Sequence, residues 1–186
     1  SPGHFSPPDN IGANFFPALG CYSCYDPDTL ALHMKQLCQA GIGVIASSWW
    51  GQGTYTDSAL PLLLKAAYAV GIQVCVHIEP YPGRTALSVK SDLIYLEENY
   101  GSSPAWYRLP AFNNKALYYV YDSYLISPQD WAAILTPEGE HSIRKTPADA
   151  LLIGLYVKEN DKDALLAGGF DGAYTYFATE GFTYGS

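Results

Sequence analysis

The stretch with the clearest chemical potential is residues 75–84, CVHIEPYPGR, which places polar side chains where a strand should end. Alternation along it predicts a strand with Cys75, His77 and Glu79 on one face and aliphatic residues on the other. Pro80 lacks a backbone donor and favours an extended Glu79, so the strand should stop there. Glu79 is then a strand-end carboxylate that can accept hydrogen bonds from a polar ligand. The alternative is a solvated loop glutamate.

Other polar and aromatic groups are expected at the same edge of a sheet. Tyr81 and Arg84 come next in the same loop, Trp50 follows a short apolar run, and Asp122 and Tyr124 follow another. In parallel α/β barrels the carboxyl ends of the strands form the catalytic face, so groups gathered there indicate a ligand site. Aromatic faces flanked by polar groups suit sugar rings, although they are also ordinary core material.

These groups must be positioned by alternating helices and strands. Asp26 caps a predicted helix that has Pro27 at its first position and ends at Gly41, and Asp57 caps the next helix, which ends at Gly71. The same signals, with the apolar periodicity, predict helices at 27–40, 57–70, 88–100, 129–135 and 161–167 and strands at 42–46, 72–78, 117–121, 150–157 and 172–177.

The order of these elements predicts an α/β fold. Strand-plus-helix periods of roughly 30 residues imply parallel strands joined by right-handed crossovers. A (β/α)8 barrel closes that pattern but takes about 250 residues. A chain of 186 residues is therefore either an open doubly wound sheet or a contiguous piece of a barrel. An open sheet would carry a nucleotide-binding turn, GxGxxG or GxxxxGKS/T, after an early strand, and none follows the predicted strands.

Composition narrows the class of protein. One globular domain over residues 1–186 is expected, with residues 1–25 as a loop-like approach in which only 11–16 is apolar enough to pack. The net charge of −8 and the pI near 4.7 exclude the basic surface that nucleic acid requires. No apolar run reaches the about 18 residues of a membrane span. The Pro-rich start lacks the apolar core of a signal peptide, which indicates a processed N-terminus.

The four cysteines do not predict a metal site. Cys21, Cys24, Cys38 and Cys75 lack the two closely spaced pairs that typically bind zinc. Cys21 and Cys24 are candidates for a disulfide in an oxidising compartment. Cys38, on a predicted helix, and Cys75, on a predicted strand, are expected to be small buried hydrophobes.

A family resemblance runs along the whole chain. The segments that carry it are, in order, SPPDNIGANFFPALG, HMKQL, IGVIASSWW, HIEPYPGR, YVYDSYLISPQDW, HSIRKTP and GFDGAYTYFATEGFTYGS. Together they resemble the endo-α-1,2-mannosidases of glycoside hydrolase family 99. The resemblance implies a (β/α)8 barrel, of which this chain would hold about five of eight units, strands two to six.

The resemblance also implies an activity. The family's enzymes retain configuration and cleave internal α-1,2-mannosidic bonds of N-glycans or mannans, with no cofactor or metal. One carboxylate is proposed to deprotonate the sugar's own 2-hydroxyl, giving a 1,2-anhydro intermediate, while a second protonates the leaving oxygen. Both acids lie in a late Asn-Glu-Trp-His-Glu segment, which does not occur in this chain. No residue here is therefore assigned as catalytic, and Glu159 and Glu180 are not promoted to that role.

Sugar-binding roles do carry over to predicted strand ends. Trp50 would stack on a sugar at the remote, non-reducing subsite, unless it is a core tryptophan like its neighbour Trp49. Glu79, in HIEPY, would accept hydrogen bonds from mannose hydroxyls, with Tyr81 and Arg84 organising it.

Five further residues have weaker assignments. Tyr176 corresponds to a tyrosine that hydrogen-bonds the carboxylate acting on the 2-hydroxyl. Asp122 and Tyr124 either line the same floor or form a buried structural pair. His77 is either a ligand contact or a satisfied core histidine, with the core role slightly favoured, and His141 is expected to anchor its loop.

Two functions of different class follow. The first is a glycosidase acting on an α-1,2-mannose-containing glycan. The second is a truncated, non-catalytic barrel that binds glycans or assembles with itself, because open sheet edges recruit partners. An incomplete barrel also predicts that its remaining segments belong to the same or another chain. The expected location is the secretory pathway, in the Golgi lumen for an animal protein, and otherwise extracellular or periplasmic.

Overall fold

The computed structural model describes residues 14–176, 180, 181 and 184 as an α/β unit built on one predominantly parallel sheet. The strands are β1 (Val44–Trp49), β2 (Gln73–Ile78), β3 (Arg108–Leu109), β4 (Lys115–Val120), β5 (Leu151–Leu155) and β6 (Gly172–Tyr174). The parallel order is β1-β2-β4-β5-β6, and β3 pairs antiparallel with β4. The predicted parallel strands are confirmed within a few residues, and the short β3 was not predicted. The predicted end of the last strand, Phe177, lies outside the described residues.

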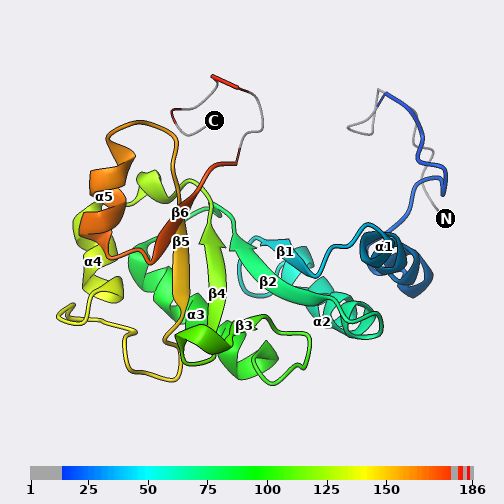
Figure 1. Ribbon diagram of the computed structural model, residues 1–186, viewed down its shortest axis with the longest axis horizontal. Coiled ribbons are helices and arrows are strands. Elements are labelled where there is room, and N and C mark those ends of the chain that lie inside the picture. The colour runs from blue at the N-terminus through cyan, green and yellow to red at the C-terminus, as the bar shows by residue number, and fades with distance from the viewer. Residues whose placement is uncertain (1–13, 177–179, 182–183, 185–186) are drawn as a thin grey trace.

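Helices follow the strands as predicted. They are α1 (Pro27–Gln39), α2 (Tyr55–Tyr68), α3 (Ala86–Tyr100), α4 (Pro128–Leu135) and α5 (Asp161–Gly168), with single 3₁₀ turns at Pro110–Phe112 and Ser123–Leu125. Figure 1 shows α3, α4 and α5 on one side of β4 and β5, and α1 and α2 beside β1 and β2. None of these helices is both long and apolar enough to cross a membrane. The arrangement is part of a (β/α) barrel.

Helix starts were predicted well where the capping residue is local. Asp26 accepts a hydrogen bond from the backbone N of Asp28, and Ser127 caps α4 in the same way. The predicted cap of α2 was wrong. Thr54 occupies that position, with an extended backbone, and its side chain accepts from the backbone N of Asp57. Asp57 is instead turned inward and buried.

The core forms where the outer face of the sheet meets the helices. The predicted alternation of β2 is confirmed, since Val74, Val76 and Ile78 are fully buried against this core. Trp49 is also buried and packs in the same cluster. Burying an aliphatic side chain of this size contributes about 1.5–3 kcal/mol, so the outer face of β2 stabilises the core while its other face is left for the site.

Strand β1 differs from the prediction of a buried strand at 42–46. It begins at Val44, and every second residue faces outward, with Val44 itself exposed. In the described part of the chain β1 is the terminal strand of the order and pairs only with β2. A strand with one neighbour and one covered face buries only alternate residues, which is why apolar content overstated its burial.

The approach segment and its cysteines also correct the sequence-based picture. Phe15 and Phe16 are exposed at 83% and 53% and do not pack, while residues 1–13 lie outside the described residues. Cys21 and Cys24 are exposed free thiols rather than a disulfide, and the Cys24 thiol lies 3.0 Å from the Tyr55 hydroxyl. Cys75 is buried as predicted. Cys38 is exposed, so its predicted burial was wrong.

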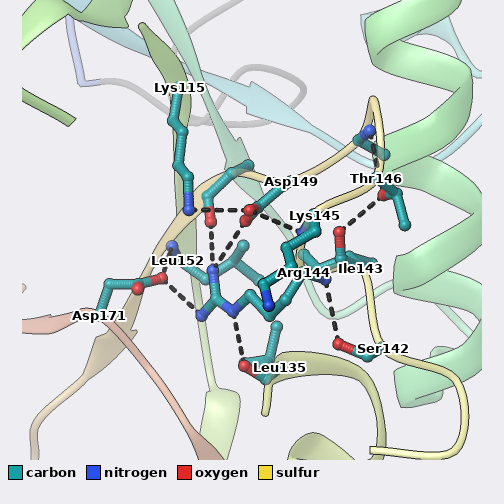
Figure 2. A network of polar contacts seen from close by, with 12 residues as sticks. Lys115, Leu135, Ser142, Ile143, Arg144, Lys145, Thr146, Asp149, Leu152 and Asp171 are labelled. Atoms are coloured by element: carbon teal, nitrogen blue, oxygen red, sulfur yellow. Dashed lines mark hydrogen bonds and ion pairs between the residues drawn. The ribbon is translucent and has the colours of Figure 1, made fainter. Parts of the chain in front are cut away.

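One arginine ties together the elements at the amino ends of β4, β5 and β6. The Arg144 guanidinium donates to the Leu135 carbonyl at 2.6 Å, the Ala150 carbonyl at 2.7 Å and the Asp171 carboxylate at 2.9 Å. It also reaches the Asp149 carboxylate at 3.2 Å and the Gly169 carbonyl at 3.1 Å. Figure 2 shows Leu135, Asp149 and Asp171 around the Arg144 guanidinium, with Lys115 bonded to the same Asp149 carboxylate. In barrels this rim serves stability.

A second polar cluster is centred on Asp57, which is only 3% exposed. Its carboxylate accepts hydrogen bonds from the Trp49 indole at 2.9 Å, the Tyr95 hydroxyl at 2.8 Å and the Tyr100 hydroxyl at 2.9 Å. Burial by itself would raise the pKa of Asp57, but these bonds, with one from the Gly53 backbone, lower it below its ordinary value. Asp57 is therefore held as a buried carboxylate.

We expect Asp57→Asn to lower the free energy of unfolding by about 2–3 kcal/mol at pH 7, because an amide leaves some of these donors mismatched. Since the folded-state pKa is depressed, the stabilisation is present above the unfolded pKa of about 3.9 and is lost as pH falls through the folded value. The deficit should therefore shrink below about pH 4. Thermal unfolding at pH 7 and below about pH 4 tests this. The control is Asp28→Asn, which removes a charge from an exposed residue in the first turn of a helix. Equal deficits in the two variants would contradict it.

Candidate active site

The inner face of the sheet carries a hollow of about 370 Å³ that extends along β1 and β2 to the residues at their carboxyl ends. Its lining is Val44, Ala46, Ser48, Cys75, His77, Glu79, Tyr119, Tyr174 and Tyr176. These side chains come from β1, β2, β4 and β6, and from residues just after β2 and β6 end, Glu79 and Tyr176. The alternation that buries one face of β2 in the core is the cause, because it turns Cys75, His77 and Glu79 to the opposite face.

A hydrogen-bonded chain crosses this hollow. The Ser48 hydroxyl donates to Oε1 of Glu79 at 2.8 Å, and Nδ1 of His77 lies 2.9 Å from the same oxygen. Nε2 of His77 lies 2.7 Å from the Tyr174 hydroxyl. Both bonds end on Oε1. Oε2 of Glu79 accepts none from any residue in the described part of the chain. The carboxylate is thus fixed by one oxygen and leaves the other for a ligand.

His77 is the satisfied histidine that the sequence favoured, and it also lines the hollow. It is buried, both ring nitrogens have partners, and its ring packs near Tyr121 and Tyr176 at centroid distances of 5.4 and 5.8 Å. In the tautomer with its proton on Nδ1, His77 donates to Glu79 and accepts at Nε2 from the Tyr174 hydroxyl, which satisfies both contacts. The bond between β2 and β6 spans 97 residues of sequence, so no local signal could have predicted it.

Burial disfavours ionisation of two groups in the hollow, Tyr174 and Cys75. Burial, with the nearby Glu79 charge, raises the pKa of Tyr174 far above its usual range. Burial likewise raises the pKa of the Cys75 thiol to about 11, so Cys75 is not a nucleophilic thiolate at neutral pH. Glu79 is the only carboxylate that lines this hollow in the described part of the chain.

Aromatic rings form the walls. Tyr119 and Tyr174 meet edge to face at 5.0 Å, and Tyr121 and Tyr176 do so at 4.9 Å. Sequence reasoning named Tyr176 but assigned no role to Tyr174, Tyr119 or Ser48. Ser48 could have been found, because it lies two residues before Trp50 and therefore shares its face of the strand.

Trp50 lies at the end of β1, and its side chain is 44% exposed. Its neighbour Trp49 is fully buried and bonded to Asp57, so the two indoles point to opposite faces as their alternation predicted. The core role weighed for Trp50 therefore belongs to Trp49 alone. Trp50 is not among the residues that line the hollow, but its exposed indole presents an aromatic face just after the end of β1.

The backbone N of Tyr81 donates to the Glu79 carbonyl at 2.9 Å, but the side chains of Tyr81 and Arg84 contact groups other than the Glu79 carboxylate. The Tyr81 hydroxyl donates to the Asp92 carboxylate and lies 2.7 Å from the Ser88 hydroxyl. The Arg84 guanidinium donates to the Tyr121 carbonyl at 2.7 Å and the Asp122 carbonyl at 2.8 Å. Arg84 thus joins the loop after β2 to the end of β4, and its support of the hollow is indirect.

Asp122, Tyr124 and His141 are further residues that the sequence analysis named. The Tyr124 hydroxyl donates to Asp122 at 2.8 Å, so the predicted pair forms, but Tyr124 is 53% exposed and the pair is not buried. Asp122 has a left-handed backbone with φ of 48°. The loop of His141 is anchored through its backbone, since the backbone N of His141 donates to the Ala133 carbonyl at 2.9 Å; an anchoring role of the imidazole stays a prediction.

Neither a metal centre nor a second acid is evident in the described residues. They contain no group of three or more His, Cys, Asp or Glu side chains that could hold a metal ion. Glu159 and Glu180 are both exposed and do not line the hollow. The geometry supports binding of a neutral, hydroxyl-rich ligand: one fixed carboxylate oxygen, several phenols and an exposed indole.

Several known proteins are similar to this chain in sequence and in structure. A glycoprotein endo-alpha-1,2-mannosidase from Xenopus laevis is 45% identical over 99% of this chain, and a glycoprotein endo-alpha-1,2-mannosidase-like protein from Mus musculus is 47% identical over the same share. The chain spans 43% and 42% of these relatives. A GH99 endo-alpha-mannosidase structure from Bacteroides thetaiotaomicron aligns over 98% of this chain and 55% of its own, with a TM-score of 0.88 and 40% identity. Because the profile of Glycosyl hydrolase family 99 matches residues 1–186, the chain belongs to that family.

Proposed function

We propose that this chain forms the sugar-binding part of a retaining endo-α-1,2-mannosidase, with Glu79 and Trp50 as its main contacts to the glycan. The observation that carries the proposal is the half-engaged carboxylate of Glu79, a residue that lines the hollow. Its Oε1 is fixed by Ser48 and His77, and its Oε2 has no hydrogen-bond donor among the described residues. A carboxylate held in this way accepts charge-assisted hydrogen bonds from sugar hydroxyls without first having to reorganise.

The proposed contacts divide the glycan between two places. Glu79 and the surrounding phenols would bind hydroxyls of one mannose, whereas the Trp50 indole would stack on the apolar face of the sugar at the remote, non-reducing subsite. Tyr176, Asp122 and Tyr124 lie at the same edge and would complete the floor. Tyr81 and Arg84 support this edge from beneath it, as their hydrogen bonds to Asp92 and to strand-end carbonyls indicate.

The proposed chemistry needs two carboxyl groups, and no residue of this chain is assigned to either role. A base would deprotonate the sugar's 2-hydroxyl, which attacks the anomeric carbon to give a 1,2-anhydro sugar, while an acid protonates the leaving oxygen. Water then opens the anhydro ring. The residues described here would contribute binding and orientation of the glycan, and no cofactor. We further propose that the protein acts in the secretory pathway or outside the cell.

The proposal is tested on protein expressed from its complete coding sequence and incubated with an oligosaccharide that contains an internal α-1,2-mannosidic bond. We expect release of a disaccharide from the non-reducing end, detected by mass spectrometry. We expect Trp50→Ala to raise KM about tenfold, because stacking on an aromatic ring is worth about 1–2 kcal/mol. Folding should be unaffected, since the side chain is half exposed. A variant with unchanged KM would remove Trp50 from the site.

A glycan-binding role without hydrolysis is the second candidate. It is favoured by the single carboxylate that lines the hollow in the described part of the chain and by the exposed face of β1. Calorimetric titration with α-1,2-mannobiose separates the two functions. Binding without release of any product from the oligosaccharide would favour the second, and release of a disaccharide would favour the first.

A further inference from the structure

The loop that carries Trp50 rests on two buried carboxylates. We define the Trp50 loop as residues 50–54, between the end of β1 and the start of α2. The backbone N of Gly53 donates to Asp57 at 2.8 Å, and the side-chain amide of Gln52 donates to Oδ1 of Asp92 at 2.9 Å. Asp57 belongs to α2 and Asp92 to α3, so the loop is fixed to two different helices.

We call the hydrogen bond from Gln52 to Asp92 the latch. Gln52 is exposed in the loop, but its amide reaches inward to a carboxylate that is only 4% exposed. The second oxygen of Asp92 accepts a hydrogen bond from the Tyr81 hydroxyl. Tyr81 in turn supports the loop from below, because a Cβ on Gly51 would lie 3.6 Å from its ring. Gly51 has φ of +108°, a backbone conformation that glycine adopts without strain and other residues do not.

Fold stability alone does not account for Asp92. A buried carboxylate is costly unless it is paired with a cation, and the hydrogen-bond partners of Asp92 in the described residues are an amide and a phenol. Burial raises the pKa of Asp92, and the hydrogen bonds from Tyr81 and Gln52 only partly offset that effect. An apolar residue of similar size would suit a position on the inner side of α3 better. What the carboxylate provides, and an apolar residue cannot, is an acceptor for the loop.

We infer that Asp92 is a positioning residue that holds the Trp50 loop through Gln52 and Tyr81, and thereby sets the position of the indole that binds the remote sugar. The part of the inference that concerns sugar binding rests on the proposed function, but the latch between Gln52 and Asp92 does not. Asp92 would act without touching the glycan, since it lies buried beneath the loop. Affinity at the remote subsite then depends on a residue of α3 rather than only on those that line the hollow.

The first test is Gln52→Ala, because Gln52 is exposed and its loss should not unfold the protein. Its matched control is Asn99→Ala, which also removes an exposed amide that donates at 2.8 Å, in that case to the Tyr95 carbonyl within α3. We expect hydrogen exchange of the backbone amides in residues 50–54 to rise about tenfold in Gln52→Ala and to stay unchanged in Asn99→Ala. Unchanged exchange in Gln52→Ala would overturn the inference.

The second test measures the sugar. Using protein expressed from its complete coding sequence, we expect Gln52→Ala and Asp92→Leu each to raise the Kd for α-1,2-mannobiose about fivefold, and the double variant no more than either alone, because both break the same latch. Asn99→Ala should bind as the unmodified protein does. Faster exchange with unchanged affinity in Gln52→Ala would overturn the role in sugar binding. Failure of the unmodified protein to bind would instead overturn the proposed function, and the exchange experiment would still decide the latch.

Discussion

Replacing Glu79 with glutamine is expected to weaken binding of α-1,2-mannobiose about 100-fold, the largest effect of any single change in the hollow. A neutral amide loses the charge that strengthens hydrogen bonds from sugar hydroxyls, and two such bonds are worth about 3 kcal/mol together. The amide must also accept from both Ser48 and His77, which fixes its nitrogen toward the ligand as a donor. Calorimetric titration of protein expressed from its complete coding sequence measures the change.

The matched control is Glu97→Gln on α3, which changes charge equally. Glu97 is partly buried and paired with Arg108, but it does not line the hollow. Its variant should keep the affinity of the unmodified protein. Both variants should unfold within a few degrees of the unmodified protein. If Glu79→Gln bound the disaccharide within threefold of the unmodified protein, Glu79 would not be the principal sugar contact.

Replacing Arg144 with alanine is expected to lower the free energy of unfolding by about 3–5 kcal/mol, the largest effect expected on stability. The side chain is 11% exposed and engages two carboxylates and three carbonyl oxygens. Its removal takes the guanidinium away from the Asp171 carboxylate and from the three carbonyl oxygens, while Asp149 keeps the Lys115 ammonium at 2.8 Å. Removing one partner of a largely buried pair is the costly way to break it. The Asp171 carboxylate also accepts from the backbone N of Leu152 at 2.9 Å and so connects β5 to β6.

The control for this change is Lys145→Ala, next in the chain. It removes the same charge from an exposed side chain and should cost little, whereas Arg144→Lys should recover only part of the loss, because an ammonium cannot reproduce the planar fork. Urea unfolding followed by circular dichroism measures all three variants. Similar free energies for Arg144→Ala and Lys145→Ala would show that the network contributes no more than an exposed charge.

Much of the fold could be predicted because its signals are local. The caps at Asp26 and Ser127 act within three residues of their helices, and the period of two along 74–78 already separated the core face of β2 from the face with Cys75, His77 and Glu79. The helical periods of α3 and α4 were found for the same reason. These features depend on backbone geometry and on neighbours in sequence, so one chain suffices to predict them.

The failures share a different cause. Aspartate is a common helix cap, and Asp57 lies three residues after Thr54, which does cap α2. The Asp57 carboxylate instead accepts hydrogen bonds from Trp49, Tyr95 and Tyr100, which belong to other elements. Cys38 satisfied a helical pattern, and only the packing of neighbouring elements could have shown that its side chain is exposed. The two-residue strand β3 has too little sequence to carry a period.

The sequence by itself determined the order of strands and helices, the end of β2 at Glu79 and the membership of the chain in its family, because each depends on residue type and local spacing. Only the tertiary structure decided which of the strand-end groups act together. Tyr174 meets His77 across the sheet, Tyr81 turns to Asp92, and Gln52 reaches the same carboxylate. Those contacts join residues from 11 to 97 positions apart, and side-chain direction over such separations is set by packing rather than by the local chain.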